Sequence, residues 1–203
     1  MIIADRFVWL HLPKTGGTSM NDLFRGLGIR GLRVDPDDTP RKHDSIRLRE
    51  SRGLWRAGQR IRFITARRLS DWLLSDWHHK RRHMNLPELP FEPVRCGLSY
   101  SLRLGGTWVA ADWWLQYFEV NEQTRSLRLE HLESDLNREL LPLLPPRTPA
   151  LPAPPQRNAD PQRQQREQRF SREDLERIHS VNPRWHAWEQ RVYGSIAGLE
   201  GEA

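Results

Sequence analysis

The chain has 203 residues, a length typical of one domain with a hydrophobic core, and its nine tryptophans supply apolar surface that a disordered chain would not need. Its 32 lysines and arginines outnumber its 26 aspartates and glutamates, and the resulting net charge of +6 favours an anionic partner. The single cysteine, Cys96, excludes an internal disulfide framework and favours a reducing compartment.

No apolar stretch approaches the roughly 20 residues that a transmembrane helix needs. Residues 1–14, "MIIADRFVWLHLPK", also lack the charged-then-apolar pattern of a signal peptide. We therefore expect a cytoplasmic protein that does not associate with a membrane.

The first predicted element is a buried strand in residues 6–12, "RFVWLHL", which is short, apolar and rich in strand formers. Apolar residues from Met20 to Leu27 then follow the spacing of an amphipathic helix, which Gly28 would end. The loop "HLPKTGGTS" connects the two. The sequence thus predicts a strand, a glycine-rich loop and a helix in succession.

A second strand and helix follow the same order. Residues 61–66, "IRFITA", are predicted as a strand, and residues 67–83, "RRLSDWLLSDWHHKRRH", as a helix with basic residues near its C-terminal end. Between the two pairs lie a polar, proline-punctuated segment, 33–45, and a segment of helical character, 45–55.

The downstream pattern is more varied. Residues 84–105 are predicted to be irregular, 107–120 helical, 125–130 a short strand and 132–144 an amphipathic helix. Because strands and helices alternate, we expect an α/β fold with a central parallel β-sheet flanked by helices.

Prolines dominate the region before the C-terminal part of the chain. The proline-rich loop at about 142–161 cannot form regular structure, and it is expected to be extended. The segment 171–193 is predicted to be helical, because Ser171 and Asp174 have the spacing of a capping box and an apolar stripe follows them.

The loop between the first strand and helix has the composition of an anion-binding site. Glycines at a helix N-terminus let backbone N–H groups approach an oxyanion, and lysine and hydroxyl side chains add donors. The order differs from G-x-x-x-x-G-K-[ST], because Lys14 precedes Gly16 and Gly17, so a triphosphate is disfavoured. The alternative is a tight connection with a solvated lysine.

This loop resembles the 5′-phosphosulfate loop of sulfotransferases that use 3′-phosphoadenosine 5′-phosphosulfate (PAPS). The resemblance is to the carbohydrate-modifying branch and its bacterial family-2-like members, whose loop reads PKTGGTS or nearly so. It implies a single sulfotransferase-like domain over residues 1–203, with a P-loop-like three-layer sandwich. The residues that it implies for phosphosulfate binding are Lys14, Thr15, Gly16, Gly17, Thr18 and Ser19. Lys14 would also stabilise the leaving phosphate oxygen.

A second signature of the family is an arginine at the end of a later strand and a serine eight residues on. Arg67 and Ser75 have this separation, and the resemblance implies that they bind the 3′-phosphate of the cofactor. Ser75 could instead be a plain helix-surface hydroxyl. Leu69 and Trp72 stand where the family commonly has a proline and a further arginine, and Arg68 is the candidate replacement for the missing charge.

Sulfuryl transfer to an alcohol needs a base for the hydroxyl proton, and histidine suits that task near neutral pH. The segment 41–55, which begins "RKHDS", resembles the Lys-His segment that precedes the 3′-phosphate signature in a bacterial-type branch. The resemblance implies that His43 is the general base and that Lys42 lies near the sulfate. His43 could also be an exposed loop histidine. His11 ranks second, because strand alternation predicts that it packs or hydrogen-bonds beside the site.

Three further features have weaker interpretations. His79 and His83 have the i, i+4 spacing of a metal pair, but no further ligand accompanies them, so a solvated helix end is favoured. Glu130 is expected to be structural. Asn158 falls where the family often has an asparagine near the cofactor.

The sequence therefore predicts an enzyme, a sulfotransferase that moves a sulfuryl group from PAPS to a hydroxyl-bearing acceptor, expected to be a carbohydrate. Its product would be adenosine 3′,5′-bisphosphate (PAP), and the chemistry requires no metal. No nucleic-acid partner is expected. Two alternatives stay open: a P-loop-type nucleotide kinase or phosphotransferase, and a non-catalytic relative that binds anions or nucleic acid.

Overall fold

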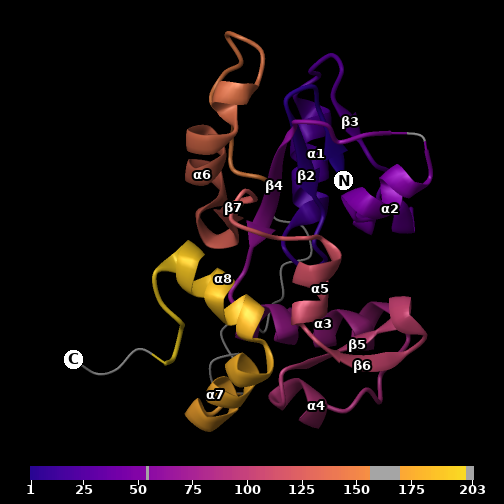
Figure 1. Ribbon diagram of the computed structural model, residues 1–203, viewed down its shortest axis with the longest axis vertical. Coiled ribbons are helices and arrows are strands. Elements are labelled where there is room, and N and C mark those ends of the chain that lie inside the picture. The colour runs from indigo at the N-terminus through magenta and orange to yellow at the C-terminus, as the bar shows by residue number, and fades with distance from the viewer. Residues whose placement is uncertain (54, 156–169, 200–203) are drawn as a thin grey trace. The chain divides into compact units, whose positions relative to one another are not determined.

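The computed structural model describes residues 1–53, 55–155 and 170–199 (Figure 1). The chain divides into two compact units, each described here by itself. The first unit is Met1–Ala66 with Tyr117–Asn158, and the second is Arg67–Gln116 with Ala159–Ala203. A single domain over residues 1–203 stays a prediction.

The first unit contains a five-stranded sheet with the strand order β3-β1-β2-β4-β7. Its strands are β1 (Ile2–Ile3), β2 (Phe7–Leu10), β3 (Arg33–Val34), β4 (Ile61–Ala66) and β7 (Arg125–Arg128). Strands β2, β4 and β7 are parallel, which confirms the α/β class.

The sheet is mixed, so the prediction of a wholly parallel sheet is wrong at one edge. β1 is antiparallel to both β2 and β3. Only residues 4–6 connect β1 to β2, and the Ala4 N–H donates to the Phe7 carbonyl across this turn. So short a connection can join only antiparallel neighbours. Strands of two residues carry too little periodicity to be predicted.

Helices cover the sheet of the first unit. They are α1 (Gly17–Gly26), α2 (Ile46–Ser51) and α6 (Leu132–Glu139), with 3₁₀ turns at Pro40–His43, Leu129–His131 and Leu141–Leu143. The predicted strand, loop and helix at the N-terminus are confirmed, with α1 ending at Gly26 rather than at Gly28. The predicted strand at 125–130 and the helix that follows it are also present.

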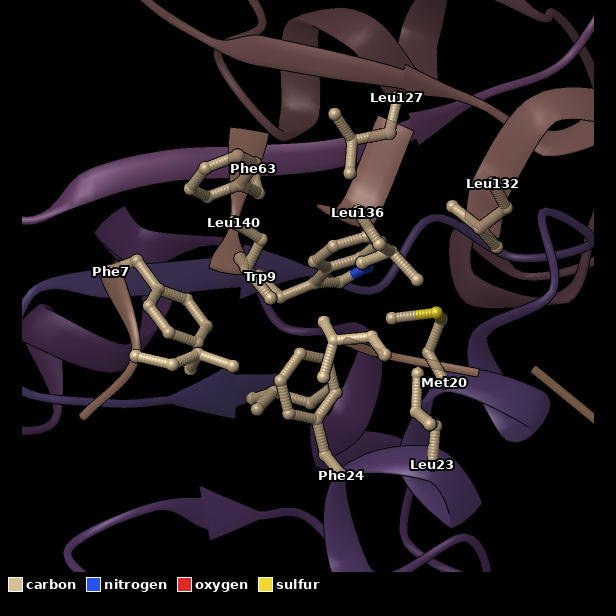
Figure 2. Packing of buried hydrophobic residues seen from close by; sticks show 13 residues of the cluster. Phe7, Trp9, Met20, Leu23, Phe24, Phe63, Leu127, Leu132, Leu136 and Leu140 are labelled. Carbon is tan, nitrogen blue, oxygen red and sulfur yellow. The ribbon is translucent and has the colours of Figure 1, made fainter. Parts of the chain in front are cut away.

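The core of the first unit is aromatic (Figure 2). Phe7 and Trp9 lie on the same face of β2, and Trp9 is the register partner of Phe63 on β4. The Trp9 and Phe63 rings stack with centroids 6.1 Å apart, while Phe7 meets Phe63 edge to face at 5.9 Å. Met20 and Phe24 of α1 are fully buried against them. Leucines from α1, β7, and α6 with its C-cap residue also belong to the cluster: Leu23, Leu127, Leu132, Leu136 and Leu140. This packing fixes the end of β2, where the glycine-rich loop begins.

The second unit is largely helical. Its helices are α3 (Leu69–His83), α4 (Glu92–Arg95), α5 (Asp112–Tyr117), α7 (Arg172–Val181) and α8 (Pro183–Tyr193). Strands β5 (Leu98–Ser101) and β6 (Thr107–Ala110) form an antiparallel pair. The predicted capping box at Ser171 and Asp174 is confirmed in full.

Two secondary-structure predictions in this region are wrong. Residues 84–105 are not irregular throughout, because they contain α4 and β5. The predicted helix at 107–120 begins with β6, since Thr107 to Ala110 pair with β5 across a turn in which Gly105 and Gly106 both have positive φ. Pairing with a neighbouring strand overrode the local helical pattern.

None of the helices within the described ranges combines the length and the apolar character that crossing a bilayer requires.

Candidate functional site

The glycine-rich loop leads directly into the N-terminus of α1. Gly16 is the N-cap residue, in a left-handed conformation with φ 78°, and α1 begins at Gly17. Neither a side-chain cap nor an acidic residue occupies the first turn. The first N–H groups of a helix have no intrahelical acceptor, and the helix dipole places partial positive charge there. The end of α1 therefore has the properties of an anion-binding site.

The two adjacent glycines are required for different reasons. Gly16 has a positive φ, and a Cβ atom there would also lie 2.9 Å from Cδ1 of Leu129. Gly17 does not have a positive φ, but a Cβ atom there would lie 1.8 Å from Nε2 of His11. The His11 side chain is buried and thus occupies the space that any side chain at Gly17 would need.

Gly17→Ala is expected to lower the free energy of unfolding by about 1–3 kcal/mol, because the added methyl group overlaps a buried ring. The matched control is Gly26→Ala in the same helix, where nothing lies within 4 Å of the added Cβ. That variant should gain about 0.5–1 kcal/mol from better helix propensity. Urea unfolding followed by circular dichroism measures both. Equal effects of the two variants would contradict the clash with His11.

The side chains of the loop differ in their surroundings. Thr15 is buried, and its hydroxyl donates to the carbonyl of Leu12 at 2.8 Å, so it braces the loop. Lys14 is half-buried and has a left-handed backbone with φ 64°. Thr18 is half-buried and Ser19 is buried in the first turn of α1. Because the Thr15 hydroxyl already donates its hydrogen to Leu12, a bound anion would more readily accept a hydrogen bond from the backbone N–H of Thr15.

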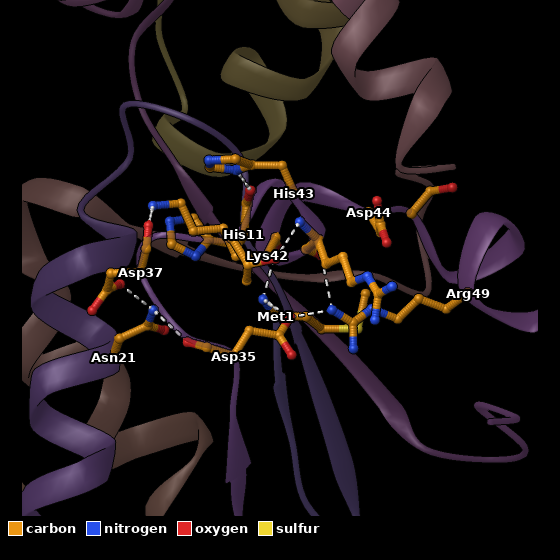
Figure 3. A network of polar contacts seen from close by, with 12 residues as sticks. Met1, His11, Asn21, Asp35, Asp37, Lys42, His43, Asp44 and Arg49 are labelled. Carbon is orange, nitrogen blue, oxygen red and sulfur yellow. Dashed lines mark hydrogen bonds and ion pairs between the residues drawn. The ribbon is translucent and has the colours of Figure 1, made fainter. Parts of the chain in front are cut away.

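His43 lies beside this loop (Figure 3). Its Nδ1 is 2.8 Å from the carbonyl oxygen of His11, and the two imidazole rings meet edge to face with centroids 4.7 Å apart. A carbonyl oxygen can only accept, so Nδ1 carries the hydrogen and Nε2 carries the lone pair of neutral His43. The structure thus brings together the predicted loop and the predicted base within the first unit.

His11 is held in its neutral form. Burial lowers the pKa of His11 well below its ordinary value of 6.5, and repulsion from the protonated forms of His43, the Met1 amino group and Lys42 lowers it further. The ring also lies against the first residue of α1, where the helix dipole disfavours a cation. His11 therefore packs beside the site, as the strand alternation predicts.

A polar network attaches the segment that carries His43 to α1 (Figure 3). Asn21 donates to Asp37 at 2.7 Å, and Arg25 forms an ion pair with the same carboxylate at 2.6 Å. Burial alone would raise the pKa of Asp37, but the hydrogen bonds from Arg25 and Asn21 outweigh it and lower that pKa. Arg49 of α2 is paired with Asp35. The acidic residues before His43 therefore fix its position, a role that the sequence analysis missed.

Lys42 has a structural contact in this network. Its ammonium group donates to the carbonyl of Asp37. The family resemblance implies that Lys42 lies near the sulfate, and this stays a prediction.

The predicted 3′-phosphate residues lie in the second unit. Arg67 directly follows β4 in the chain, and its carbonyl accepts a hydrogen bond from the indole N–H of Trp185 at 3.2 Å. Ser75 is half-buried in α3, two turns along the helix. The loop and His43 belong to the first unit, so the structure groups the predicted site residues into two sets.

Arg68 is used to anchor the start of α3. Its guanidinium donates to Glu189 at 3.3 Å and to the Ser195 carbonyl at 3.0 Å, and it packs over the ring of Tyr193 at 4.5 Å. The buried Glu189 carboxylate also accepts from the Leu69 N–H at 2.8 Å, which caps α3. These contacts give Arg68 a structural role at the start of α3, while the phosphate contact suggested by its sequence position stays a prediction.

The structure describes two of the three weaker candidates. The rings of His79 and His83 lie 5.1 Å apart on α3, but no group of three or more metal-ligating side chains occurs in the described part of the chain. Glu130 is exposed in the 3₁₀ turn after β7. Asn158 lies outside the described residues.

Comparisons of the chain with models of protein families, with curated proteins and with solved structures found no match.

Proposed function

We propose that this chain is a sulfotransferase that moves a sulfuryl group from PAPS to a hydroxyl of a carbohydrate acceptor, on a P-loop-like three-layer α/β sandwich. The observation that carries the proposal is the bond between Nδ1 of His43 and the His11 carbonyl. It leaves the basic Nε2 of His43 on a ring held directly beside an anion-binding loop. The loop sequence supplies the resemblance to PAPS-dependent enzymes.

The residues of the loop fit a phosphosulfate group. The start of α1 has no side-chain cap and no acidic residue, so its first N–H groups and the helix dipole favour an anion there. In the proposal, Lys14 and the amides of residues 15–19 hold the 5′-phosphosulfate. The binding of the 3′-phosphate by Arg67 and Ser75 stays what the family resemblance implies. When bound, PAPS supplies the sulfuryl group, whose sulfur forms a bond to the acceptor oxygen as its bond to the phosphate oxygen breaks.

The chain's own residues then have two tasks. His43 accepts the acceptor's hydroxyl proton at Nε2, which makes the attacking oxygen more nucleophilic. Lys14 and the N-terminal amides of α1 stabilise the negative charge that develops on the departing phosphate oxygen. The polar network around Asp37 keeps His43 in place, so the base needs no reorganisation during the reaction.

Thermal unfolding with added nucleotides tests the proposal. PAP alone is expected to raise the unfolding temperature, since a ligand at one hundred times its Kd adds about 2.7 kcal/mol to stability. A response only to ATP with Mg²⁺ would contradict the proposal and favour a phosphotransferase. PAP binding without sulfate transfer to any of a broad panel of carbohydrate acceptors would favour a non-catalytic relative.

A further inference from the structure

We propose that His11 is a positioning residue: its imidazole, wedged between Gly17 and the ring of His43, holds His43 in the Nδ1–H form that presents Nε2 as the base. The catalytic part of this inference rests on the proposed function. The positional part concerns only the side chains of the first unit, and it can be tested without any substrate.

Two contacts of the His11 side chain carry the inference. Its ring fills the space beside Gly17, so closely that a Cβ atom there would lie 1.8, 2.1 and 2.5 Å from Nε2, Cδ2 and Cε1. The same ring also contacts the His43 ring, with centroids 4.7 Å apart and an interplanar angle of 73°. The His11 side chain is therefore a spacer between the first residue of α1 and the candidate base.

The backbone of His11 contributes a third contact to the same arrangement. Its carbonyl accepts the Nδ1 hydrogen of His43 at 2.8 Å. His11 thus selects the tautomer of His43 through its backbone carbonyl and limits the orientation of the His43 ring through its side chain. Removing the side chain leaves the carbonyl but frees the ring of His43 to turn away from it.

The uncharged state of His11 suits this role. A buried cation beside the start of α1 would be disfavoured by desolvation and by the helix dipole. The low pKa of His11 keeps it neutral around neutral pH. The ring therefore acts through its shape and contacts, and the proton of the reaction is left to His43.

Nitrogen-15 NMR of histidine-labelled full-length protein tests the positional part, because two-bond couplings distinguish the tautomers of each imidazole. The His43→Ala spectrum assigns the His43 signals. We expect the Nδ1–H form of His43 in the wild type and a mixture of tautomers in His11→Ala. His131→Ala, which removes an exposed histidine of the same unit, should leave the His43 signals unchanged.

Two further variants keep the proposal testable if His11→Ala does not fold. His11→Gln keeps a polar group near Gly17 but lacks the ring face, and it should also give mixed tautomers. Gly17→Ala keeps both histidines in the sequence but displaces the His11 ring, so it too should mix the His43 tautomers. In the His11→Ala background, adding Gly17→Ala should have no further effect on them. An unchanged Nδ1–H form of His43 in every folded His11 variant would overturn the proposal.

Steady-state kinetics test the catalytic part. His11→Gln is expected to lower kcat about tenfold or more while the affinity for PAP changes less than about threefold, because a displaced base affects the reaction more than binding. If tautomers mix but the wild type transfers no sulfate, the positional inference stands and the proposed function fails. If the wild type transfers sulfate and the His43 tautomer is unchanged in the His11 variants, the proposed function stands and the positional inference fails.

Discussion

His43→Ala is expected to lower the turnover of sulfate transfer by about two to four orders of magnitude, the range that a general base contributes. The physical reason is the loss of Nε2, the ring nitrogen that carries the lone pair when Nδ1 donates to the His11 carbonyl. The affinity for PAP should stay within about threefold of the wild type, because the proposed function assigns cofactor binding to Lys14 and the backbone amides of the loop and not to His43. Radiolabelled sulfate transfer and calorimetric titration with PAP measure the two quantities.

His131→Ala is the matched control for this experiment. His131 is exposed in the first unit, in the 3₁₀ turn after β7, and it should change neither quantity. A His43→Ala enzyme with full activity would show that another group is the base. A parallel loss of PAP affinity and turnover would instead indicate that His43 holds the loop in shape.

Lys14→Gly is expected to lower kcat by about two to three orders of magnitude, because the charge that stabilises the departing phosphate is lost. Stability should change little. Lys14 has φ 64°, a conformation that costs a residue with a Cβ about 1–2 kcal/mol and costs glycine nothing. Replacing Lys14 with glycine removes this strain, but glycine also loses about 0.5–1 kcal/mol more conformational entropy on folding, which offsets most of the gain in stability. Kinetics and urea unfolding on one preparation separate the two effects.

Arg147→Gly provides the control for Lys14→Gly. Arg147 is also a basic residue of the first unit with a left-handed backbone, φ 70°, and its side chain is exposed. The variant therefore removes the same charge from the same backbone conformation away from the loop. It should leave turnover unchanged. An equal loss of activity in both variants would show that the activity depends on the net positive charge of the protein and not on the position of Lys14.

The sequence alone determined the strand, loop and helix that build the anion-binding end of α1. Apolar runs, helical spacing and adjacent glycines act over a few residues, so local physical chemistry is enough to predict β2, the loop and α1. The same holds for β4 and α3, and for the capping box at Ser171. The choice of His43 came from resemblance to a family, and the structure places that residue beside the loop.

Other features depended on contacts between residues far apart in the chain, which no local pattern encodes. β1 and β3 are too short to show a period, and β6 became a strand only by pairing with β5. The pair of Arg68 with Glu189, 121 residues later in the sequence, also had no local signal.

Tertiary structure also decided why the loop has a second glycine. Gly17 has an ordinary backbone conformation, and nothing in the sequence "KTGGTS" distinguishes its role from that of Gly16. Only the fold shows that the ring of His11, six residues earlier, fills the space of the missing side chain and also contacts the ring of His43. Local sequence determined the loop and the start of α1, whereas long-range packing decided which imidazole stands beside them and in which tautomer.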